Sequence, residues 1–369
     1  MIRICFAVSS LCNEGPVNVM YNIIRYIDFS KFEVSIITFI PEKKTTRMED
    51  FQEFPLTIHQ LAPQKQLNPL SLFKAFKQAV CQTDPDMIHA HCPRSLYLMC
   101  FLPHKYKRIY TIHIYPGLQQ QILYGKLKGD IVILLNNYFT KKVDLPIGCA
   151  ESVGDLYKKH KNWDILCIPN GSSLPIWHED PPYRQKLRKG MGLREDVKYF
   201  IFIGRFSAEK NPDLIIQAFK QSHSEQVGLI MLGNGPLWDV LKREENEHII
   251  LPGFKTNVYD YLIAADYYIS ASDVEGLANT VLESMTVGLP MLLSDIPSHR
   301  EVLAKTNKTT GYIFNNKDVN DLLEKIDRVI NLERKEVIKE VQYTFLKYYT
   351  AEKMSLSYQN VYSDLYNKA

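Results

Sequence analysis

The sequence contains no apolar run long enough to cross a membrane, which takes about 20 residues. The run Ile131–Leu135 is far too short, and Met1–Val8 lacks the basic and long apolar regions of a signal peptide. We therefore expect Met1–Val8 to form a first strand. We expect the chain to be cytoplasmic, with a peripheral position at the inner face of the membrane as a further possibility.

Cysteine pairs and several cofactor motifs are also absent. The 7 cysteines include no C-x-x-C pair, which fits reduced thiols in a cytosolic protein. No G-x-G-x-x-G follows a predicted strand, which argues against a Rossmann dehydrogenase. The D-x-D letters of Asp84-Pro85-Asp86 precede a strand and read as a turn rather than a metal site. We also expect His89 and His91 to lie on opposite faces of one strand and to form no metal pair.

Net charge is small, but it is divided unevenly along the chain. Residues 1–172 hold 20 Lys and Arg against 14 Asp and Glu (20 − 14 = +6), and residues 173–369 hold 24 against 27 (24 − 27 = −3). A basic first half suits anionic lipid headgroups or a phosphorylated substrate, and a solvated surface of mixed charge fits equally well. The acidic second half argues against a nucleic-acid-binding protein.

Apolar strand patterns alternate with helical patterns along the chain, which predicts parallel sheets covered by helices. The turn-rich segment Pro169–Pro175 interrupts the alternation, and Tyr199–Ile203 restarts it. We predict an α/β protein with two Rossmann-like doubly wound domains, residues 1–171 and 172–345, which face each other across a cleft. Residues 346–369 are predicted to form a C-terminal helix that crosses back to the first domain. Clefts between domains are common ligand sites.

The segment Ser272–Pro290 carries two carboxylates, Glu275 before a predicted helix and Glu283 within it. Eight helical residues rise about 12 Å, so the pair cannot share a proton. We expect Glu283 to accept hydrogen bonds from a ribose and Glu275 to contact a second polyol. The amides between them are expected to face a phosphate at the helix amino end: those of Gly276, Leu277 and Ala278.

Two cations, Arg205 and Lys210, lie in the loop after Tyr199–Ile203. A guanidinium grips phosphate oxygens in a bidentate fork, and a lysine adds a point charge. They could neutralise a leaving diphosphate, or they could simply be surface cations near a helix. Gly15, after the first strand, is either a phosphate-approaching residue or an ordinary turn residue.

Together these residues resemble the retaining glycosyltransferases of glycosyltransferase family 4, which have a GT-B fold. The resemblance is specific from about Ile168 to Leu303 and depends on the following segments: Gly204-Arg205 with Lys210, Leu232–Pro236, Gly253, Glu275-Gly276-Leu277 with Glu283 (E-x7-E), Gly288-Leu289-Pro290 and Arg300-Glu301-Val302.

The resemblance implies roles for individual residues. The catalytic group would be Glu275, Lys210, Arg205 and His113, with His113 beside the donor sugar. The donor-binding group would be Gly15, Arg205, Lys210, Phe254, Lys255, Glu275, Gly276, Leu277, Ala278 and Glu283, with Phe254 and Lys255 near the base. Two residues depart from the family pattern. Pro16 removes an amide where a second glycine is usual, which puts phosphate contact by Gly15 in doubt, and Ser284 replaces the usual alanine.

The implied reaction moves a hexose or N-acetylhexosamine from a nucleoside diphosphate sugar to a hydroxyl group, with retention of configuration. A UDP-sugar is preferred and a guanosine donor is the alternative. The acceptor would be a saccharide or lipid-linked saccharide in surface polysaccharide or glycan assembly. We expect no cofactor, no metal and no nucleic acid, and we expect peripheral contact with an anionic membrane. The alternatives are a non-catalytic nucleotide-sugar-binding subunit and a GT-B nucleotide-sugar hydrolase or epimerase.

Overall fold

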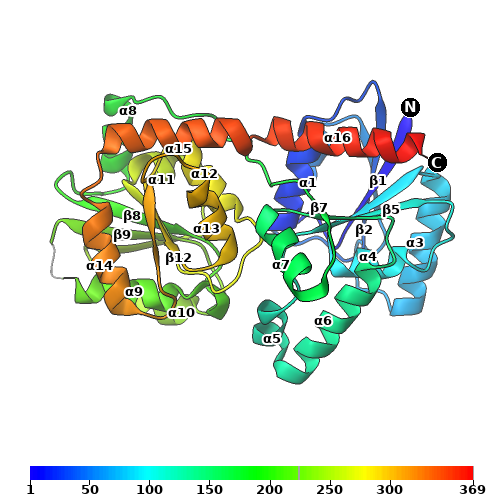
Figure 1. Ribbon diagram of the computed structural model, residues 1–369, viewed down its shortest axis with the longest axis horizontal. Coiled ribbons are helices and arrows are strands. Elements are labelled where there is room, and N and C mark those ends of the chain that lie inside the picture. The colour runs from blue at the N-terminus through cyan, green and yellow to red at the C-terminus, as the bar shows by residue number, and fades with distance from the viewer. Residues whose placement is uncertain (223–224, 369) are drawn as a thin grey trace. The chain divides into compact units, whose positions relative to one another are not determined.

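The computed structural model describes residues 1–222 and 225–368, and its chain divides into two compact units. Unit 1 comprises Met1–Ser173 together with the segment from Thr350 onward, and unit 2 comprises Leu174–Tyr349. Each unit contains one parallel sheet with helices packed on it, as Figure 1 shows. The predicted α/β class with two doubly wound sheets is confirmed.

The sheet of unit 1 has the strand order β3-β2-β1-β4-β5-β6-β7, so the order reverses between β1 and β4. Its central strands are almost fully apolar because helices cover them on both faces. The strands are β1 (Ile2–Val8), β2 (Phe32–Thr38), β3 (Leu56–Gln60), β4 (Met87–Ala90), β5 (Lys107–Ile112), β6 (Leu145–Gly148) and β7 (Leu166–Cys167).

In the described residues of unit 1, eight helices complete the fold, and the last of them comes from the C-terminal segment of the chain. They are α1 (Gly15–Arg25), α2 (Met48–Gln52), α3 (Pro69–Thr83), α4 (Pro93–Met99), α5 (Leu118–Tyr124), α6 (Lys126–Thr140), α7 (Glu151–Lys161) and α16 (Ala351–Asn367). No helix in the described part of the chain is both long and apolar enough to span a bilayer.

Helix α16 supplies part of the core of unit 1. Its Met354, Tyr358 and Tyr362 are buried among side chains of β1 and α1. The hydroxyl of Tyr362 lies 2.8 Å from Nδ1 of His89. The C-terminal helix begins at Ala351 rather than at residue 346, because α15 (Arg334–Tyr348) continues past that residue and the Thr350 side chain caps α16.

The sheet of unit 2 has the order β10-β9-β8-β11-β12-β13 and reverses between β8 and β11. Its strands are β8 (Lys198–Ile203), β9 (Val227–Leu232), β10 (Ile249–Gly253), β11 (Tyr267–Ser270), β12 (Met291–Ser294) and β13 (Gly311–Phe314).

The helices of unit 2 are α8 (Pro181–Gly190), the 3-10 turn η1 (Ala208–Lys210), α9 (Pro212–Gln221), α10 (Trp238–Leu241), the 3-10 turn η2 (Lys242–Glu244), α11 (Val258–Ala264), α12 (Asn279–Val287), α13 (Pro297–Ala304), α14 (Val319–Val329) and α15 (Arg334–Tyr348). Helices α9 and α12 lie where the sequence pattern predicts a helix. The sequence pattern over Pro236–Glu245 predicts a single helix, but only the short α10 and η2 form there.

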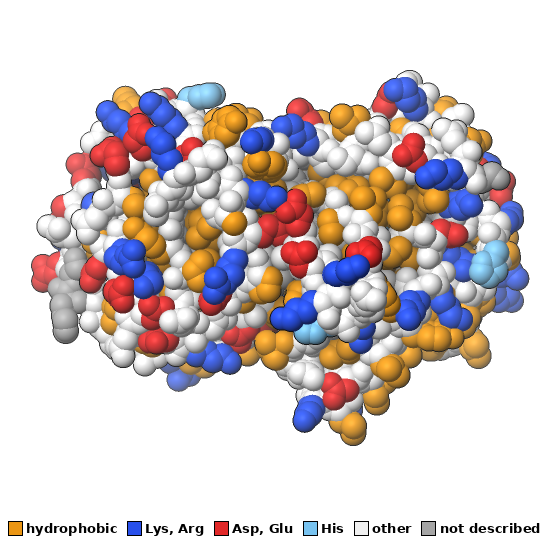
Figure 2. All heavy atoms as spheres, in the orientation of Figure 1, with side chains coloured by type: hydrophobic (Ala, Val, Ile, Leu, Met, Phe, Trp, Pro, Cys, Tyr) orange, Lys and Arg blue, Asp and Glu red, His pale blue; other side chains and the backbone are white. Residues whose placement is uncertain are grey.

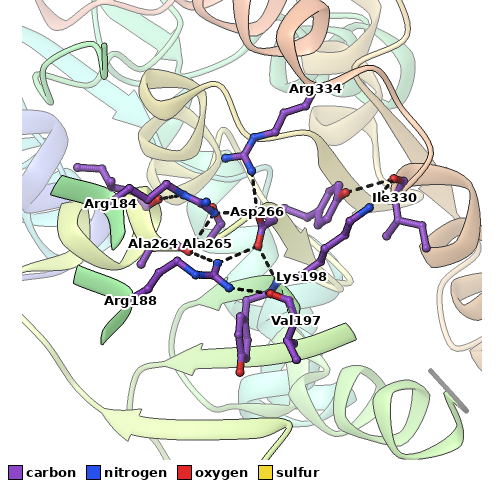
Figure 3. Close-up of polar contacts among 12 residues, drawn as sticks. Arg184, Arg188, Val197, Lys198, Ala264, Ala265, Asp266, Ile330 and Arg334 are labelled. Carbon is purple, nitrogen blue, oxygen red and sulfur yellow. Dashed lines mark hydrogen bonds and ion pairs between the residues drawn. The ribbon is translucent and has the colours of Figure 1, made fainter. Parts of the chain in front are cut away.

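A buried carboxylate holds the amino ends of β8 and β11 together (Figure 3). Asp266 Oδ1 accepts from Arg184 and Arg334, each at 2.7 Å, and Oδ2 accepts from Arg188 at 3.1 Å. Oδ2 also accepts from the backbone amide of Tyr199 at 2.9 Å. Burial alone would raise the pKa of Asp266, but the surrounding arginines hold it below its ordinary value. This cluster fixes the two strands whose other ends carry Lys210 and Glu275.

Candidate active site

The candidate site of unit 2 lies where the strand order reverses, between β8 and β11. In open α/β sheets ligands bind at the carboxyl ends of the strands at such a reversal. Lys210 belongs to η1 after β8, and Glu275 belongs to the loop after β11. Their side chains form an ion pair, so the fold joins residues that are 65 positions apart in sequence.

The environment of this ion pair leaves one carboxylate oxygen for a ligand. Both side chains are partly buried, with 23% of Lys210 and 14% of Glu275 exposed. Ser272 Oγ also donates to Glu275 Oε1, at 2.8 Å. Within the described residues both hydrogen bonds to Glu275 therefore use Oε1, and Oε2 can accept from a sugar hydroxyl. The two loops are tied to each other by Asn211 Nδ2, which donates to the Ala271 carbonyl at 2.9 Å.

Arg205 is held beside this loop by Glu209. The guanidinium donates to Glu209 Oε1 at 2.9 Å, and Ser207 Oγ donates to the same oxygen at 2.7 Å. Burial alone would raise the pKa of Glu209, but these hydrogen bonds lower it, so the carboxylate stays ionised. Only 3% of the Glu209 side chain is exposed, against 57% of Arg205. Glu209 thus positions a cation whose outer surface is open to an anion.

Close backbone contact explains the glycines beside these loops. Gly233 has a φ of +149°, and a Cβ there would lie 1.8 Å from the Gly204 carbonyl oxygen. A Cβ on Gly235 would lie 2.5 Å from the Phe206 carbonyl oxygen. The loops after β8 and β9 therefore pack backbone against backbone, which only glycine permits.

Helix α12 places Glu283 on the same side of unit 2 as Glu275. Its first residue is Asn279, with Ala278 as the N-cap, so Glu275 precedes the helix and Glu283 lies inside it, as predicted. Tyr268 on β11 is close enough to both glutamates for their charges to affect it. Burial chiefly raises the pKa of its hydroxyl, and the two carboxylates raise it further.

The remaining predicted donor-binding residues differ in exposure. Gly276 and Leu277 are buried, Ala278 and Lys255 are half-buried, and Phe254 is 48% exposed. Phe254 and Lys255 follow β10, the edge strand of the sheet. Their predicted position near the base stays a prediction.

In unit 1, His113 follows β5 and contacts another histidine. Its Nε2 lies 3.1 Å from Nδ1 of His91, which follows β4. Burial lowers the pKa of His113 to about 3, so its imidazole is neutral at physiological pH. The expected separation of His89 and His91 was wrong. Their ring centroids are 4.3 Å apart, because residues two positions apart in a strand point to the same face.

Gly15 is the first residue of α1, after β1, so it lies at the other strand-order reversal. A Cβ there would meet no atom within 4 Å, so packing does not require glycine at this position. Pro16 stands at the start of the helix, where its missing amide costs least. Among the described residues, no group of three or more His, Cys, Asp or Glu is arranged to hold a metal ion.

Two family descriptions match the chain, one in each unit. "Glycosyltransferase Family 4" matches residues 14–174, and "Glycosyl transferases group 1" matches residues 183–343. The chain belongs to the GT-B glycosyltransferases of the family 4 type. The predicted membership of family 4 with a GT-B fold is therefore confirmed.

Individual relatives agree with this membership. The chain is 29% identical over 231 residues to an alpha-monoglucosyldiacylglycerol synthase of Streptococcus pneumoniae, which covers 58% of this chain and 52% of that protein. It is 27% identical to the Escherichia coli O-antigen biosynthesis glycosyltransferase WclY, covering 77% of this chain and 80% of that protein. The chain thus spans about half the length of the first of these curated relatives.

A solved structure supports the GT-B fold. Anabaena HepE in complex with UDP-glucose superposes with a TM-score of 0.81 at 17% identity, covering 99% of this chain and 100% of that one. At this identity the likeness shows the fold alone.

Several residues of the chain are visible as candidate site residues only in the structure. Glu209 reads in the sequence as an ordinary helix-start carboxylate. His299 on α13 is 1% exposed, and its Nδ1 donates to the Ser294 carbonyl at 3.0 Å. Burial lowers the pKa of His299 to about 4, while the charges of Glu275 and Lys210 also reach it. No spacing in the sequence links these residues to the site.

Buried neutral histidines should make the protein sensitive to mild acid. Burial lowers the pKa of His89 to about 3 and that of His299 to about 4. Below pH 6.5 these imidazoles bind protons in the unfolded chain but stay neutral in the folded chain. The free energy of unfolding therefore falls as the pH falls. We expect each histidine to cost about 2 kcal/mol of unfolding free energy between pH 7 and pH 5. Urea denaturation at both pH values measures this loss.

The control for this prediction is His104→Gln, which changes an exposed histidine. We expect it to lose as much stability on acidification as the wild type. His299→Gln should lose less, because it removes one group that titrates only when unfolded. Equal unfolding free energies for the wild type at pH 7 and pH 5 would show that these imidazoles are not held neutral by the fold.

Proposed function

We propose that the protein is a retaining glycosyltransferase that uses a nucleoside diphosphate sugar, with a UDP-sugar preferred. The observation that carries the proposal is the Lys210–Glu275 ion pair at the strand-order reversal of unit 2. The pair places a cation that can bind a diphosphate next to a carboxylate that can bind a sugar. Arg205, held by Glu209, adds a second cation for the departing diphosphate.

In the proposed reaction, the acceptor hydroxyl oxygen bonds to the anomeric carbon as the bond from that carbon to the diphosphate breaks. The acceptor proton passes to an oxygen of the leaving phosphate on the same face of the sugar. Lys210 has three donors, so it can keep Glu275 and still bind a phosphate oxygen. Glu275 Oε2 holds a sugar hydroxyl, and Glu283 holds the ribose. The protein mainly positions groups and stabilises charge as it develops on the leaving group.

The acceptor is proposed to be a saccharide or lipid-linked saccharide, and unit 1 is proposed to bind it. Support comes from relatives whose names include a glucolipid synthase and an O-antigen glycosyltransferase. The proposal includes a hexose or N-acetylhexosamine as the transferred sugar, no metal requirement, and His113 as a neutral hydrogen-bonding group beside the sugar. Gly15, Phe254 and Lys255 are proposed as further donor contacts.

A ligand screen followed by a transfer assay tests the proposal. Nucleoside diphosphates and their sugars are screened by thermal shift, because a ligand that binds only the folded state raises the melting temperature. The best donor is then incubated with lipid-linked and free saccharides, with and without EDTA. NMR of the product should show the donor's anomeric configuration retained, and EDTA should not lower the rate.

The same assay separates the alternatives. Donor consumption at full rate without any acceptor would indicate a hydrolase or epimerase. Tight donor binding without turnover on any acceptor would indicate a binding subunit. An inverted product would contradict the retaining mechanism.

A further inference from the structure

Helix α6 buries several polar side chains and exposes much of its apolar surface. Its buried residues include Asn136, Asn137 and Thr140. Its exposed residues include Leu127 and Leu134, whose side chains are 79% and 70% exposed. A surface helix normally turns its apolar stripe to the core and its polar face to water. The exposed apolar face of α6 is therefore a candidate interaction surface.

The helix is held firmly in this orientation. The Tyr97 hydroxyl donates to Asn136 Oδ1, which fixes the polar face against α4. A Cβ on Gly129 would lie 2.7 Å from the Gln120 carbonyl oxygen, so α5 and α6 cross in close backbone contact. Rotation of α6 to bury its leucines would break both contacts. Exposure of the apolar face is thus a property of the folded unit.

The apolar face of α6 continues onto α5. The exposed large hydrophobic side chains of this segment form what we call the α5–α6 apolar surface: Leu118, Leu123, Tyr124, Leu127, Ile131, Leu134, Leu135 and Tyr138. Figure 2 shows hydrophobic side chains gathered over these two helices. Contiguous exposed apolar surfaces of this kind mark interaction sites.

Lysines border the α5–α6 apolar surface at both ends of α6. Lys126 and Lys128 lie at its start, and Lys141 and Lys142 follow its end, all four exposed. Residues 118–142 contain a single carboxylate, Asp130, so the segment carries 4 − 1 = +3. Asp130 accepts from Gln121 Nε2 at 2.6 Å, within the same helix pair.

We propose that the α5–α6 apolar surface docks on an anionic lipid bilayer. An apolar helix face flanked by lysines lies in the plane of the interface, where its leucines enter the acyl boundary and its lysines meet lipid phosphates. Tyrosines suit the headgroup level because one end is apolar and the other polar. A second copy of the chain fits less well, because symmetric pairing would bring two lysine-rich surfaces together.

This docking extends the proposed function, because it would bring the enzyme to a lipid-linked acceptor. Its test reads membrane binding rather than sugar transfer, so either proposal can fail alone. The full-length protein is mixed with vesicles of 70% phosphatidylcholine and 30% phosphatidylglycerol and with vesicles of phosphatidylcholine alone, and bound protein is measured by flotation. We expect binding to the anionic vesicles that weakens at high salt.

The test variant is Leu127→Gln/Ile131→Gln/Leu134→Gln. We expect it to bind about 100-fold more weakly, because it replaces three apolar side chains that docking would bury in the membrane. Lys141→Gln/Lys142→Gln should bind the anionic vesicles about 30-fold more weakly. The matched control is Leu70→Gln/Leu356→Gln, which changes two equally exposed leucines elsewhere in unit 1 and should bind as the wild type does. Thermal midpoints should stay unchanged, because all these side chains are exposed.

Absence of wild-type binding, or unchanged binding of the triple variant, would overturn the proposal. Equal binding to neutral vesicles would overturn its anionic part. Light scattering tests whether a second copy of the chain occupies the surface instead. If the wild type were a dimer, the triple variant a monomer, and neither bound vesicles, the surface would be a dimer interface. Vesicle binding without sugar transfer would leave the docking intact and contradict the proposed function.

Discussion

Replacing Lys210 with alanine should lower turnover about 100- to 1000-fold, the usual cost of removing one group that stabilises developing charge. The structure places Lys210 Nζ on Glu275, at the carboxyl ends of β8 and β11. In the proposed reaction it stabilises negative charge on the departing diphosphate, so the loss should fall on kcat more than on KM. Steady-state kinetics with the preferred donor measure both constants.

The controls for this prediction use neighbouring charges. Lys317→Ala removes a lysine that pairs with Asp273, near the same loop, and should leave kcat close to the wild-type value. Glu283→Ala should raise the KM for the donor while lowering kcat less, because its proposed partner is the ribose. If Lys210→Ala kept wild-type turnover, its role at the leaving group would be wrong. A thermal midpoint recorded for each variant separates lost chemistry from lost folding.

Replacing Asp266 with asparagine should lower the unfolding free energy by about 3–5 kcal/mol, the range for breaking a buried ion pair. The substitution keeps the shape but leaves Arg184, Arg188 and Arg334 without their shared carboxylate. The Arg188 side chain is only 7% exposed, so water cannot replace the lost partner. Urea denaturation of both proteins at pH 7 measures the difference.

Asp196→Asn is the matched control, because Asp196 pairs with Arg194 in an exposed ion pair. Exposed pairs contribute little, so its unfolding curve should overlay that of the wild type. A curve for Asp266→Asn that also overlays the wild type would mean that the cluster in Figure 3 does not hold β8 and β11. At a temperature where Asp266→Asn stays folded, its KM and kcat should change little, because Asp266 lies at the opposite strand ends from Lys210.

The sequence was enough to predict strands β8 to β12 of unit 2 and the positions of Glu275 and Glu283, but not strand β13. Buried parallel strands such as β8 are continuous apolar runs, and the two glutamates flank a clear helix start. Strand β3 was missed because its residues are half-exposed at the sheet edge, which leaves no apolar run to detect.

The contacts within the site could not be read from the sequence. Lys210 and Glu275 meet because β8 and β11 are neighbours, and strand order is a property of the whole sheet. Glu209 depends on a local 3-10 turn to reach Arg205. Helix α6 was missed because its apolar residues Ile131–Leu135 are consecutive and therefore show no helical period.

The return of the chain to unit 1 at Thr350 sets an order for folding during synthesis. Unit 2 is continuous from Leu174 to Tyr349 and has all its parts once that segment has emerged. Unit 1 must wait for α16, whose Tyr358 and Tyr362 fill its core and contact Thr111 and His89. Unit 1, whose first residues are synthesised before those of unit 2, is therefore completed after unit 2. Until then the core of unit 1 lacks the side chains that α16 supplies, and this unfilled part is open to chaperones and proteases.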